Sequence, residues 1–289
     1  MTGRENVIER VSERIAGYGR PRAVVAFSGG VDSAVVLALA ARALGRTAVT
    51  AVTAVSPSYP AGELEQARDV ATSLGVAHRS IETGEVGREA YARNDGERCF
   101  HCKTELYGAL RRLAAGEADP DAAVLAGANL DDLADFRPGL RAARQQGIRN
   151  PLLEDGVGKA AVRAAARRLG LAVADKPSLA CLSSRVAYGI RITPGLLGRV
   201  DRAERSVRAL GFEVVRVRHL GDRASIEVDP ADVPRLVGDP RLPSLMEELR
   251  EAGWSEVAVD PKGYRTGSLN PTLRPPTARR RLELRPRTT

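Results

Sequence analysis

The sequence is poor in three features, and each shortage argues against a particular class of protein. Aromatic residues make up 4% of the 289 residues, whereas a surface that stacks on nucleic-acid bases normally needs them. The three cysteines are too few, and odd in number, for a disulfide framework. The longest uninterrupted apolar run, Ala34–Ala41, is far shorter than the roughly 20 residues of a membrane span. An RNA-binding surface, a disulfide scaffold and a membrane protein are therefore disfavoured.

The remaining composition is that of a globular protein. Apolar residues make up 43% of the chain and charged residues 28%, which is ordinary for folded domains. A length of 289 residues suggests about two domains, because one domain usually takes roughly 100–200 residues. The opening residues, MTGRENVIERVSERI, carry charges throughout and lack the apolar stretch of a signal peptide. We therefore expect a cytoplasmic protein with no membrane partner.

Positive charge is concentrated at one end of the chain. The segment from Arg274 to Thr289 holds six arginines and one glutamate, so it carries +5 of the net +8 and leaves +3 for the rest. A nucleic-acid-binding surface would instead place a basic patch on the folded domain. We expect a solvated, disordered tail, with contact to RNA or another partner as the alternative. Nucleic acid is not the expected partner.

Strand-like and helix-like segments alternate over the first two-thirds of the chain. Short apolar, mostly β-branched runs and amphipathic repeats predict these elements. The predicted strands cover 23–27, 48–54, 78–81 and 122–126, and the predicted helices cover 7–15, 32–44, 62–74, 104–114 and 159–169. Such alternation predicts a parallel sheet, on which ligands bind at the carboxyl ends of the strands.

The pattern changes after about residue 189. Thr193 followed by Pro194 predicts a helix start, and this helix runs to about residue 210. Two hairpin-spaced strands, a further helix and a last strand follow, over 213–218, 223–228, 243–252 and 256–259. This order predicts a smaller α+β domain and a linker near residues 188–193. We therefore divide the chain into domains at 1–189 and 190–273 and a tail at 274–289.

A Ser-Gly-Gly-Val-Asp-Ser loop stands between the first predicted strand and its helix. There Gly29 and Gly30 let the backbone approach a phosphate, and the helix N-terminus favours an anion. Ser28 and Ser33 add hydroxyl donors, and Asp32 suits Mg²⁺. The loop is neither a Walker A motif nor a GxGxxG motif. The alternative is that the segment has a purely structural role, as a tight glycine turn with a Ser or Asp helix cap.

The cysteines stand in two polar segments. Cys99 and Cys102 form a C-x-x-C pair, a spacing that suits metal or cluster ligation or redox chemistry. Cys181 lies in the segment KPSLACLSSR, in which Arg185 supplies a cation that favours thiolate. Inert packing of the thiols is the remaining alternative.

Six segments together resemble the LarE family of sulfur transferases, within the PP-loop ATP pyrophosphatase superfamily. They are AFSGGVDS at 26–33, ERCFHCK at 97–103, GANLDDLADFRPGLRAA at 127–143, KPSLACLSSRVAYG at 176–189, VRVRHLGDRASIEV at 215–228 and GYRTGSLN at 263–270. The resemblance spans most of the chain. It implies an α/β fold with a Rossmann-like parallel sheet of the PP-loop (adenine nucleotide alpha hydrolase-like) type, followed by a smaller α+β domain for substrate binding and oligomerisation.

The resemblance also implies a reaction. Members of the family use ATP to adenylate a carboxylate of pyridinium-3,5-biscarboxylic acid mononucleotide, and sulfur then replaces AMP to give a thiocarboxylate. The expectation of Mg²⁺ with ATP comes from the chemistry of Asp32 beside phosphate. The product belongs to the biosynthesis of the nickel-pincer nucleotide cofactor, so proteins of that pathway are expected partners. The family also implies a homo-oligomer.

Two sulfur sources occur in the family. In one branch, the cysteine matching Cys181 attacks the acyl adenylate, loses its sulfur and becomes dehydroalanine. In the other, a C-x-x-C and that cysteine ligate a [4Fe-4S] cluster carrying an extra sulfide. The three cysteines favour a cluster held by Cys99, Cys102 and Cys181. The alternatives are a sacrificial Cys181, or a zinc site that uses His101.

The resemblance assigns roles to individual residues. Cys181 and Arg185 are the expected catalytic residues. The expected ATP-binding residues are Ser28, Gly29, Gly30, Asp32, Ser33 and Gly127, and the expected substrate-binding residues are Arg216, Arg218, Ser184, Glu204 and Glu227.

Several of these residues have simpler alternatives. Arg216 and Arg218 share one strand face and suit phosphate, but two solvated strand arginines are the alternative. A helix-surface salt bridge is the alternative for Glu204. Arg137 either contributes to the site or only stabilises the loop in which it lies. The family pattern has Pro-Tyr-Gly where this chain has Ala187-Tyr188-Gly189.

Three other functions compete with this prediction. A PP-loop tRNA thiolation enzyme would need a basic RNA surface, which the +3 outside the tail disfavours. An ammonia-using ligase, such as an NAD or GMP synthetase, has no need of three loop cysteines. An adenine-nucleotide sensor would not explain the thiols either.

Overall fold

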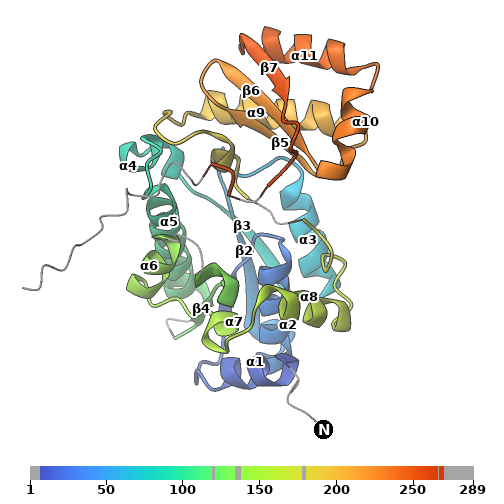
Figure 1. Ribbon diagram of the computed structural model, residues 1–289. Coiled ribbons are helices and arrows are strands. Elements are labelled where there is room, and N and C mark those ends of the chain that lie inside the picture. Colours follow the sequence, from blue (N-terminus) through green and yellow to red (C-terminus); the bar gives the residue numbers. More distant parts are fainter. Residues whose placement is uncertain (1–6, 119–120, 134–137, 178–179, 266, 270–289) are drawn as a thin grey trace, which may run out of the picture.

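The computed structural model describes residues 7–118, 121–133, 138–177, 180–265 and 267–269. The Arg-rich tail and Arg137 lie outside the described residues. The described chain forms two sheets, one in each part of the sequence (Figure 1).

The first sheet has four parallel strands in the order β3-β2-β1-β4. These strands are β1 (Ala23–Ala26), β2 (Val49–Val55), β3 (Ala77–Glu82) and β4 (Ala123–Leu125). In the centre, Val25 pairs with Ala51 on one side and with Leu125 on the other. The predicted parallel sheet is therefore confirmed, with boundaries within one or two residues of those expected.

Helices cover both faces of this sheet because side chains alternate along each strand. The helices are α1 (Val7–Ala16), α2 (Val31–Leu44), α3 (Glu63–Ser73), α4 (Glu89–Ala92), α5 (Arg98–Leu113), α6 (Pro138–Gln145), α7 (Pro151–Glu154) and α8 (Lys159–Arg168). Val25 faces a core shared with α1, α2, α3 and α8, whereas Val24 faces a core shared with α5 and α6. Figure 1 shows the resulting three layers.

Short helical turns connect these elements. They are η1 (Arg46–Ala48), η2 (Glu85–Gly87), η3 (Ala114–Ala118), η4 (Leu130–Leu133), η5 (Leu182–Arg185) and η6 (Pro230–Asp232). The turn η4 follows β4, and η5 immediately follows Cys181, so both stand next to segments expected to carry function.

Helix α5 begins earlier than predicted. The expected start near residue 104 is wrong, because the helix starts at Arg98 and includes Cys99 and Cys102. The amide of Phe100 donates to the Glu97 carbonyl at 2.8 Å, and the helix continues because neither glycine nor proline interrupts residues 98–107. The two thiols therefore stand in the first turns of a helix and not in the loop before it.

The C-terminal part contains a three-stranded sheet. Its elements are α9 (Pro194–Ala209), β5 (Val215–His219), β6 (Arg223–Val228), α10 (Val233–Val237), α11 (Leu242–Glu251) and β7 (Glu256–Val259). The β5–β6 pair is an antiparallel hairpin, and β7 runs parallel to β6. The Thr193 hydroxyl caps α9 by accepting from the Leu196 amide at 3.2 Å. The predicted α+β arrangement is confirmed.

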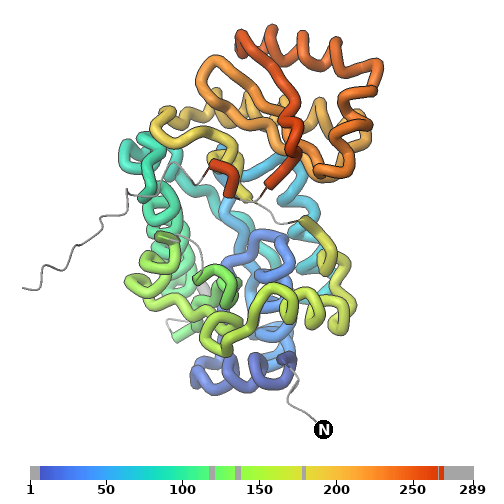
Figure 2. The backbone as a smooth tube through the Cα atoms, viewed as in Figure 1, coloured from blue at the N-terminus to red at the C-terminus, as the bar shows by residue number. Residues whose placement is uncertain are grey.

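The two parts of the molecule share a hydrophobic core. Val86 and Tyr91, which follow β3, pack with Leu182 and Val186 and with side chains of the C-terminal sheet. The C-terminal part thereby lies over the edge at which β2 and β3 end, with α1 at the far end of the molecule (Figure 2). The division at residues 189 and 190 stays a prediction, since this core crosses it.

No helix in the described part of the chain combines the length and apolar character that crossing a membrane would require.

Candidate active site

The Ser-Gly-Gly loop at the end of β1 has an internal hydrogen-bond network. Gly29 has a φ of +75°, a conformation that favours glycine. The Ser28 hydroxyl accepts from the Gly30 amide at 3.3 Å, and the Ser33 hydroxyl donates to the Gly30 carbonyl at 3.0 Å. Gly30 precedes α2 and gives it no side-chain cap. The helix N-terminus is therefore open toward an anion.

The segment after β4 packs directly on this loop. A Cβ atom added at Gly127 would lie 2.8 Å from the Ser33 nitrogen. Only glycine permits this approach without displacement of the backbone. Gly127 therefore packs against the backbone of Asp32 and Ser33, so the structure places it beside the other residues expected to bind ATP.

Asp32 has two partners that the sequence did not suggest. Its carboxylate accepts from Asn129 Nδ2 at 3.0 Å and from Lys159 Nζ at 2.5 Å. The Asp32 side chain is 26% exposed, so a ligand in solution can reach it. A carboxylate at this position suits Mg²⁺ bound together with phosphate oxygens. Two sequence features could have indicated these partners: the asparagine in GANLDD and the lysine that follows Gly-Val-Gly at a helix start.

The loop that carries Cys181 is hydrogen-bonded to the α/β part. The Leu182 amide donates to the Ser58 carbonyl at 2.8 Å, and Ser58 follows β2. The Ser183 hydroxyl and the Tyr91 hydroxyl are 2.6 Å apart. Arg98 donates to the Ser183 carbonyl at 2.9 Å. These contacts fix the loop over the carboxyl edge of the sheet.

Asn94 fixes the end of the same loop. It is fully buried and has a φ of +55°. Its amide nitrogen donates to the carbonyls of Ala187 and Ile190 at 2.8 and 2.9 Å, and its oxygen accepts from Arg98. This end of the loop is therefore held by hydrogen bonds even though residue 187 is alanine and not proline. Sequence reasoning missed Asn94 because an isolated asparagine carries no pattern.

The nucleotide loop and the Cys181 loop are joined by two neighbouring residues. The Tyr59 hydroxyl donates to the Ser28 carbonyl at 3.1 Å, next to the Ser58 carbonyl that binds the Leu182 amide. A ligand bound at the Ser-Gly-Gly loop is therefore adjacent to the segment that holds Cys181. This adjacency is what a transfer between an activated substrate and a thiol requires.

The three thiols share one electrostatic environment. Cys99 is exposed, and Cys102 and Cys181 are partly buried. Burial raises the pKa of Cys102 to about 12; Lys103 lowers it, and the charges of Cys181, Glu85 and Cys99 raise it further. Without an added cation, Cys102 is therefore a protonated thiol at neutral pH.

Arg98 belongs to the same environment. Burial alone would lower its pKa, but Cys181 and Cys99 raise it overall. The charge of Arg98 therefore interacts with Cys99 and Cys181, and Arg98 also donates to the Ser183 carbonyl in the loop that carries Cys181. Sequence reasoning missed Arg98, although it precedes the C-x-x-C directly.

Arg185 and Glu204 form a fully buried ion pair. Their side chains are 1% and 0% exposed, and Arg185 Nε lies 2.8 Å from Glu204 Oε1. Arg185 Nη1 donates to the carbonyls of Ala180 and Cys181 at 2.7 and 3.1 Å and to Ser184 Oγ at 3.0 Å. The helix-surface alternative for Glu204 is wrong, because α9 turns this carboxylate into the core. The pair fixes the backbone on both sides of the Cys181 thiol.

Arg216 and Arg218 lie next to this ion pair and are each 6% exposed. Arg218 Nε lies 2.9 Å from Glu227 Oε2, and Arg218 Nη1 donates to the Ser184 carbonyl at 3.0 Å. Burial and the Arg185 charge lower the pKa of Arg216 to about 10. The alternative of two solvated strand arginines is wrong, because the loop before α9 covers this strand.

Tyr264 is a further residue of this cluster. The Arg216 and Arg218 guanidinium carbons lie 5.0 and 5.9 Å from the centre of its ring. The ring faces both cations, an arrangement that stabilises them. The segment GYRTGSLN was part of the resemblance, but nothing in it singled out the tyrosine.

The acidic partners respond differently to burial. Burial would raise the pKa of Glu204, but Arg185 and its other arginine neighbours lower it overall. Burial raises the pKa of Glu227 more than Arg218 lowers it. Glu204 is therefore a firmly ionised partner, whereas Glu227 is the more readily protonated of the two.

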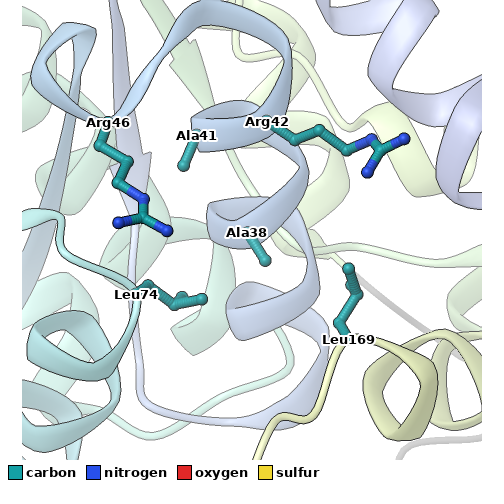
Figure 3. Close-up of a pocket in the computed structure, with 6 residues that line it drawn as sticks. All are labelled: Ala38, Ala41, Arg42, Arg46, Leu74 and Leu169. Atoms are coloured by element: carbon teal, nitrogen blue, oxygen red, sulfur yellow. The ribbon is translucent and has the colours of Figure 1, made fainter.

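A pocket of about 280 Å³ lies away from this site. It is formed by the last turns of α2 with the ends of α3 and α8, and Figure 3 shows Arg46 and Leu74 on one side and Leu169 on the other. Its lining contains no carboxylate, hydroxyl or thiol. It carries none of the chemistry found at the strand ends.

Within the described ranges, no group of three His, Cys, Asp or Glu side chains could hold a single metal ion. This disfavours the zinc alternative with His101. A zinc ion needs all its ligand atoms within about 2.3 Å of the metal. An iron–sulfur cluster instead offers a separate iron to each thiolate, so its cysteine sulfurs can lie farther apart. Three thiols around Arg98 and Lys103 are compatible in donor chemistry with a cluster.

The fold and the loop define the class of protein. The NAD synthase family matches residues 4–104, the region that contains the Ser-Gly-Gly loop. NH₃-dependent NAD⁺ synthetase of Thermotoga maritima is 41% identical over 26% of this chain and 27% of its own. The N-terminal part is therefore a PP-loop nucleotide-binding domain of the ATP- and Mg²⁺-using type.

Two relatives match nearly the whole chain. An uncharacterised protein of Synechocystis sp. is 43% identical over 87% of this chain and 93% of its own. The pyridinium-3,5-bisthiocarboxylic acid mononucleotide synthase of Lactiplantibacillus plantarum is 36% identical over 87% of this chain and 90% of its own. The chain belongs to the family of that synthase, the LarE family.

The buried ion pair leads to a stability prediction. Glu204→Gln leaves the Arg185 cation buried without its anion, so we expect the free energy of unfolding at pH 7 to fall by about 3–5 kcal/mol. The folded-state pKa of Glu204 is lowered, so its contribution is complete above the unfolded pKa near 4.3 and is lost as the pH falls through the folded pKa. Urea unfolding at several pH values measures this difference.

The matched control is Glu247→Gln, which breaks an exposed pair with Arg250. We expect that change to lower stability by less than about 1 kcal/mol. Equal losses in the two variants, or a Glu204→Gln loss that grows as the pH falls below 4.3, would contradict this assignment.

Proposed function

We propose that this protein is an ATP-dependent sulfur transferase that converts a carboxylate of pyridinium-3,5-biscarboxylic acid mononucleotide into a thiocarboxylate. The relationship to the synthase of L. plantarum carries the proposal. It is supported by a PP-loop, a buried arginine pair and three thiols around one carboxyl edge of the sheet.

The first step is adenylation. ATP would bind with its phosphates at the Ser-Gly-Gly loop, and Asp32 would hold Mg²⁺, which when bound offsets the negative charge of the phosphates. A substrate carboxylate oxygen attacks the α-phosphorus, and pyrophosphate leaves. Arg216 and Arg218 hold the anionic end of the mononucleotide, because guanidinium groups suit phosphate and carboxylate. Ser184 and Glu227 shape that site by holding Arg218, and Glu204 holds the neighbouring Arg185.

The second step brings sulfur to the acyl carbon and releases AMP. Cys99, Cys102 and Cys181 would hold a [4Fe-4S] cluster, which when bound supplies sulfide and ionises the Cys102 thiol. Use of Cys181 itself as a sacrificial sulfur donor is the second candidate, since the segment that carries it is linked to the nucleotide loop through Ser58 and Tyr59.

Arg185 acts as a positioning residue in this proposal. It was expected to be catalytic, and that role stays a prediction. Every nitrogen of its guanidinium has an acceptor, and two of these acceptors are the Ala180 and Cys181 carbonyls. A guanidinium with all three nitrogens bonded within the protein holds the thiol-bearing backbone in place.

Further features of the proposal follow from the family. We propose a substrate domain at 190–273, a homo-oligomer, a cytoplasmic location and contact with other proteins of nickel-pincer cofactor biosynthesis. The core shared by Tyr91, Leu182 and the C-terminal sheet supports a substrate domain held over the nucleotide site.

Pyrophosphate release tests the function. We expect release from ATP when the pyridinium mononucleotide is added, and none with tRNA or with ammonia and deamido-NAD. Asp32→Asn should lower the rate strongly, because the Mg²⁺ ligand is lost. Release with tRNA alone would show a tRNA thiolation enzyme, and release only with ammonia and deamido-NAD would show a synthetase.

Iron and acid-labile sulfide after anaerobic purification test the sulfur source. We expect roughly four irons per chain, lost in Cys181→Ala and retained in the control His101→Ala. The absence of iron, together with a mass loss of one H₂S from Cys181 after turnover, would show a single-use sulfur donor. Iron retained in Cys181→Ala would remove Cys181 from the ligand set.

A further inference from the structure

A buried carboxylate behind the Cys181 segment has no part in the reaction steps above. Glu85 lies in η2, the turn that follows β3, and only 3% of it is exposed. Within the described ranges, no ion pair joins Glu85 to a lysine or an arginine. A buried carboxylate without a paired cation has to be compensated by hydrogen-bond donors. The donors that Glu85 binds are therefore held firmly.

Two serine hydroxyls supply these donors. Ser56 Oγ donates to Glu85 Oε1 at 2.5 Å, and Ser58 Oγ donates to the same oxygen at 3.0 Å. Both serines lie in the serine turn, residues 56–59, which directly follows β2. The Ser58 amide also donates to Ser56 Oγ at 3.1 Å, and the Tyr59 amide donates to the Ser56 carbonyl at 3.0 Å. One carboxylate oxygen thus fixes the shape of the serine turn.

The serine turn contacts both functional loops. The Ser58 carbonyl accepts from the Leu182 amide at 2.8 Å, which holds the segment that carries Cys181. The Tyr59 hydroxyl donates to the Ser28 carbonyl at 3.1 Å, which reaches the nucleotide loop. The position of the serine turn therefore sets where these two loops lie relative to each other.

Glu85 is also tied to the helix that carries the C-x-x-C pair. The amide of Gly84, its neighbour in the chain, donates to Glu105 Oε1 at 2.9 Å. Glu105 belongs to α5 and also pairs with Arg88, on the other side of η2. The turn that presents Glu85 is thus attached to α5 at both of its ends. Through Glu85, this helix is connected to the serine turn and to the Cys181 segment.

We propose that Glu85 is a positioning residue for sulfur transfer, which holds the Cys181 segment in a fixed place relative to the nucleotide loop and to α5. This inference rests on the proposed function. Glu85 acts through the serine turn and the Leu182 amide, and it is assigned no contact with substrate. The nucleotide loop and Asp32 have hydrogen bonds of their own, whereas sulfur transfer needs the thiols and the acyl adenylate in register. Loss of Glu85 should therefore impair the second step more than the first.

Product ratios from the whole protein test this role. Pyrophosphate and thiocarboxylate are measured in the first turnover of the wild type, Glu85→Ala, Glu85→Gln and the control Glu89→Ala, which removes an exposed pair with Arg191. Acyl adenylate that no sulfur reaches is hydrolysed back to carboxylate and AMP. In Glu85→Ala we expect thiocarboxylate per pyrophosphate to fall at least about fivefold, because a displaced reacting group reacts slowly. Pyrophosphate release should stay within about threefold of the wild type.

Hydrogen exchange gives a second readout that does not depend on substrate. In Glu85→Ala, exchange of the Leu182 amide should quicken at least about fivefold, because its acceptor is no longer fixed. Exchange in β1 should be unchanged. Glu85→Gln keeps an oxygen that can accept from both serines, so it should restore most of the product ratio and of the protection. The control should match the wild type.

The outcomes separate this inference from the proposed function. An unchanged product ratio or unchanged Leu182 exchange in Glu85→Ala, or a Glu85→Gln variant as impaired as Glu85→Ala, would overturn the positioning role. Where Glu85→Ala does not fold, Ser58→Ala, which removes one of the two hydroxyls, takes its place with the same expected direction. Failure of the wild type to release pyrophosphate with the mononucleotide would instead overturn the proposed function. The exchange measurement would then still decide whether Glu85 holds the Cys181 segment.

Discussion

The candidate site depends on the way the Cys181 loop is fixed between the two parts of the molecule. The buried Arg185–Glu204 pair holds the loop from the C-terminal side, and Arg98 holds it from the α/β side. Breaking a buried pair leaves an uncompensated charge, so this arrangement has little freedom to relax. The segment that carries Cys181 is consequently held in one place, linked to the nucleotide loop through Ser58 and Tyr59.

This constraint also explains why the molecule has two sheets. The parallel sheet supplies the glycine loop and the helix N-terminus that suit a triphosphate, and the C-terminal sheet supplies Arg216 and Arg218. Neither part contains both sets of groups. The shared core, which includes Tyr91 and Leu182, joins them. Activation by ATP and capture of an anionic substrate can therefore take place within one site.

The sequence predicted the elements better than it predicted their partners. The strands and the Ser-Gly-Gly loop have local signals, namely β-branched runs and glycines before a helix. The start of α5 at Arg98 has none, because polar residues and cysteines do not mark a helix boundary. The pairings of Arg185 with Glu204 and of Asp32 with Lys159 join residues 19 and 127 positions apart. Only the folded chain brings such residues together.

The central claim is that a substrate carboxylate is activated by transfer of AMP and then attacked by sulfur. Substrate with heavy oxygen in its carboxylates tests this directly, with mass spectrometry of the AMP formed. The claim predicts one heavy oxygen in AMP, because the carboxylate oxygen that attacked the α-phosphorus leaves with it. Heavy oxygen in pyrophosphate or inorganic phosphate, or unlabelled AMP formed alongside the thiocarboxylate, would contradict the claim.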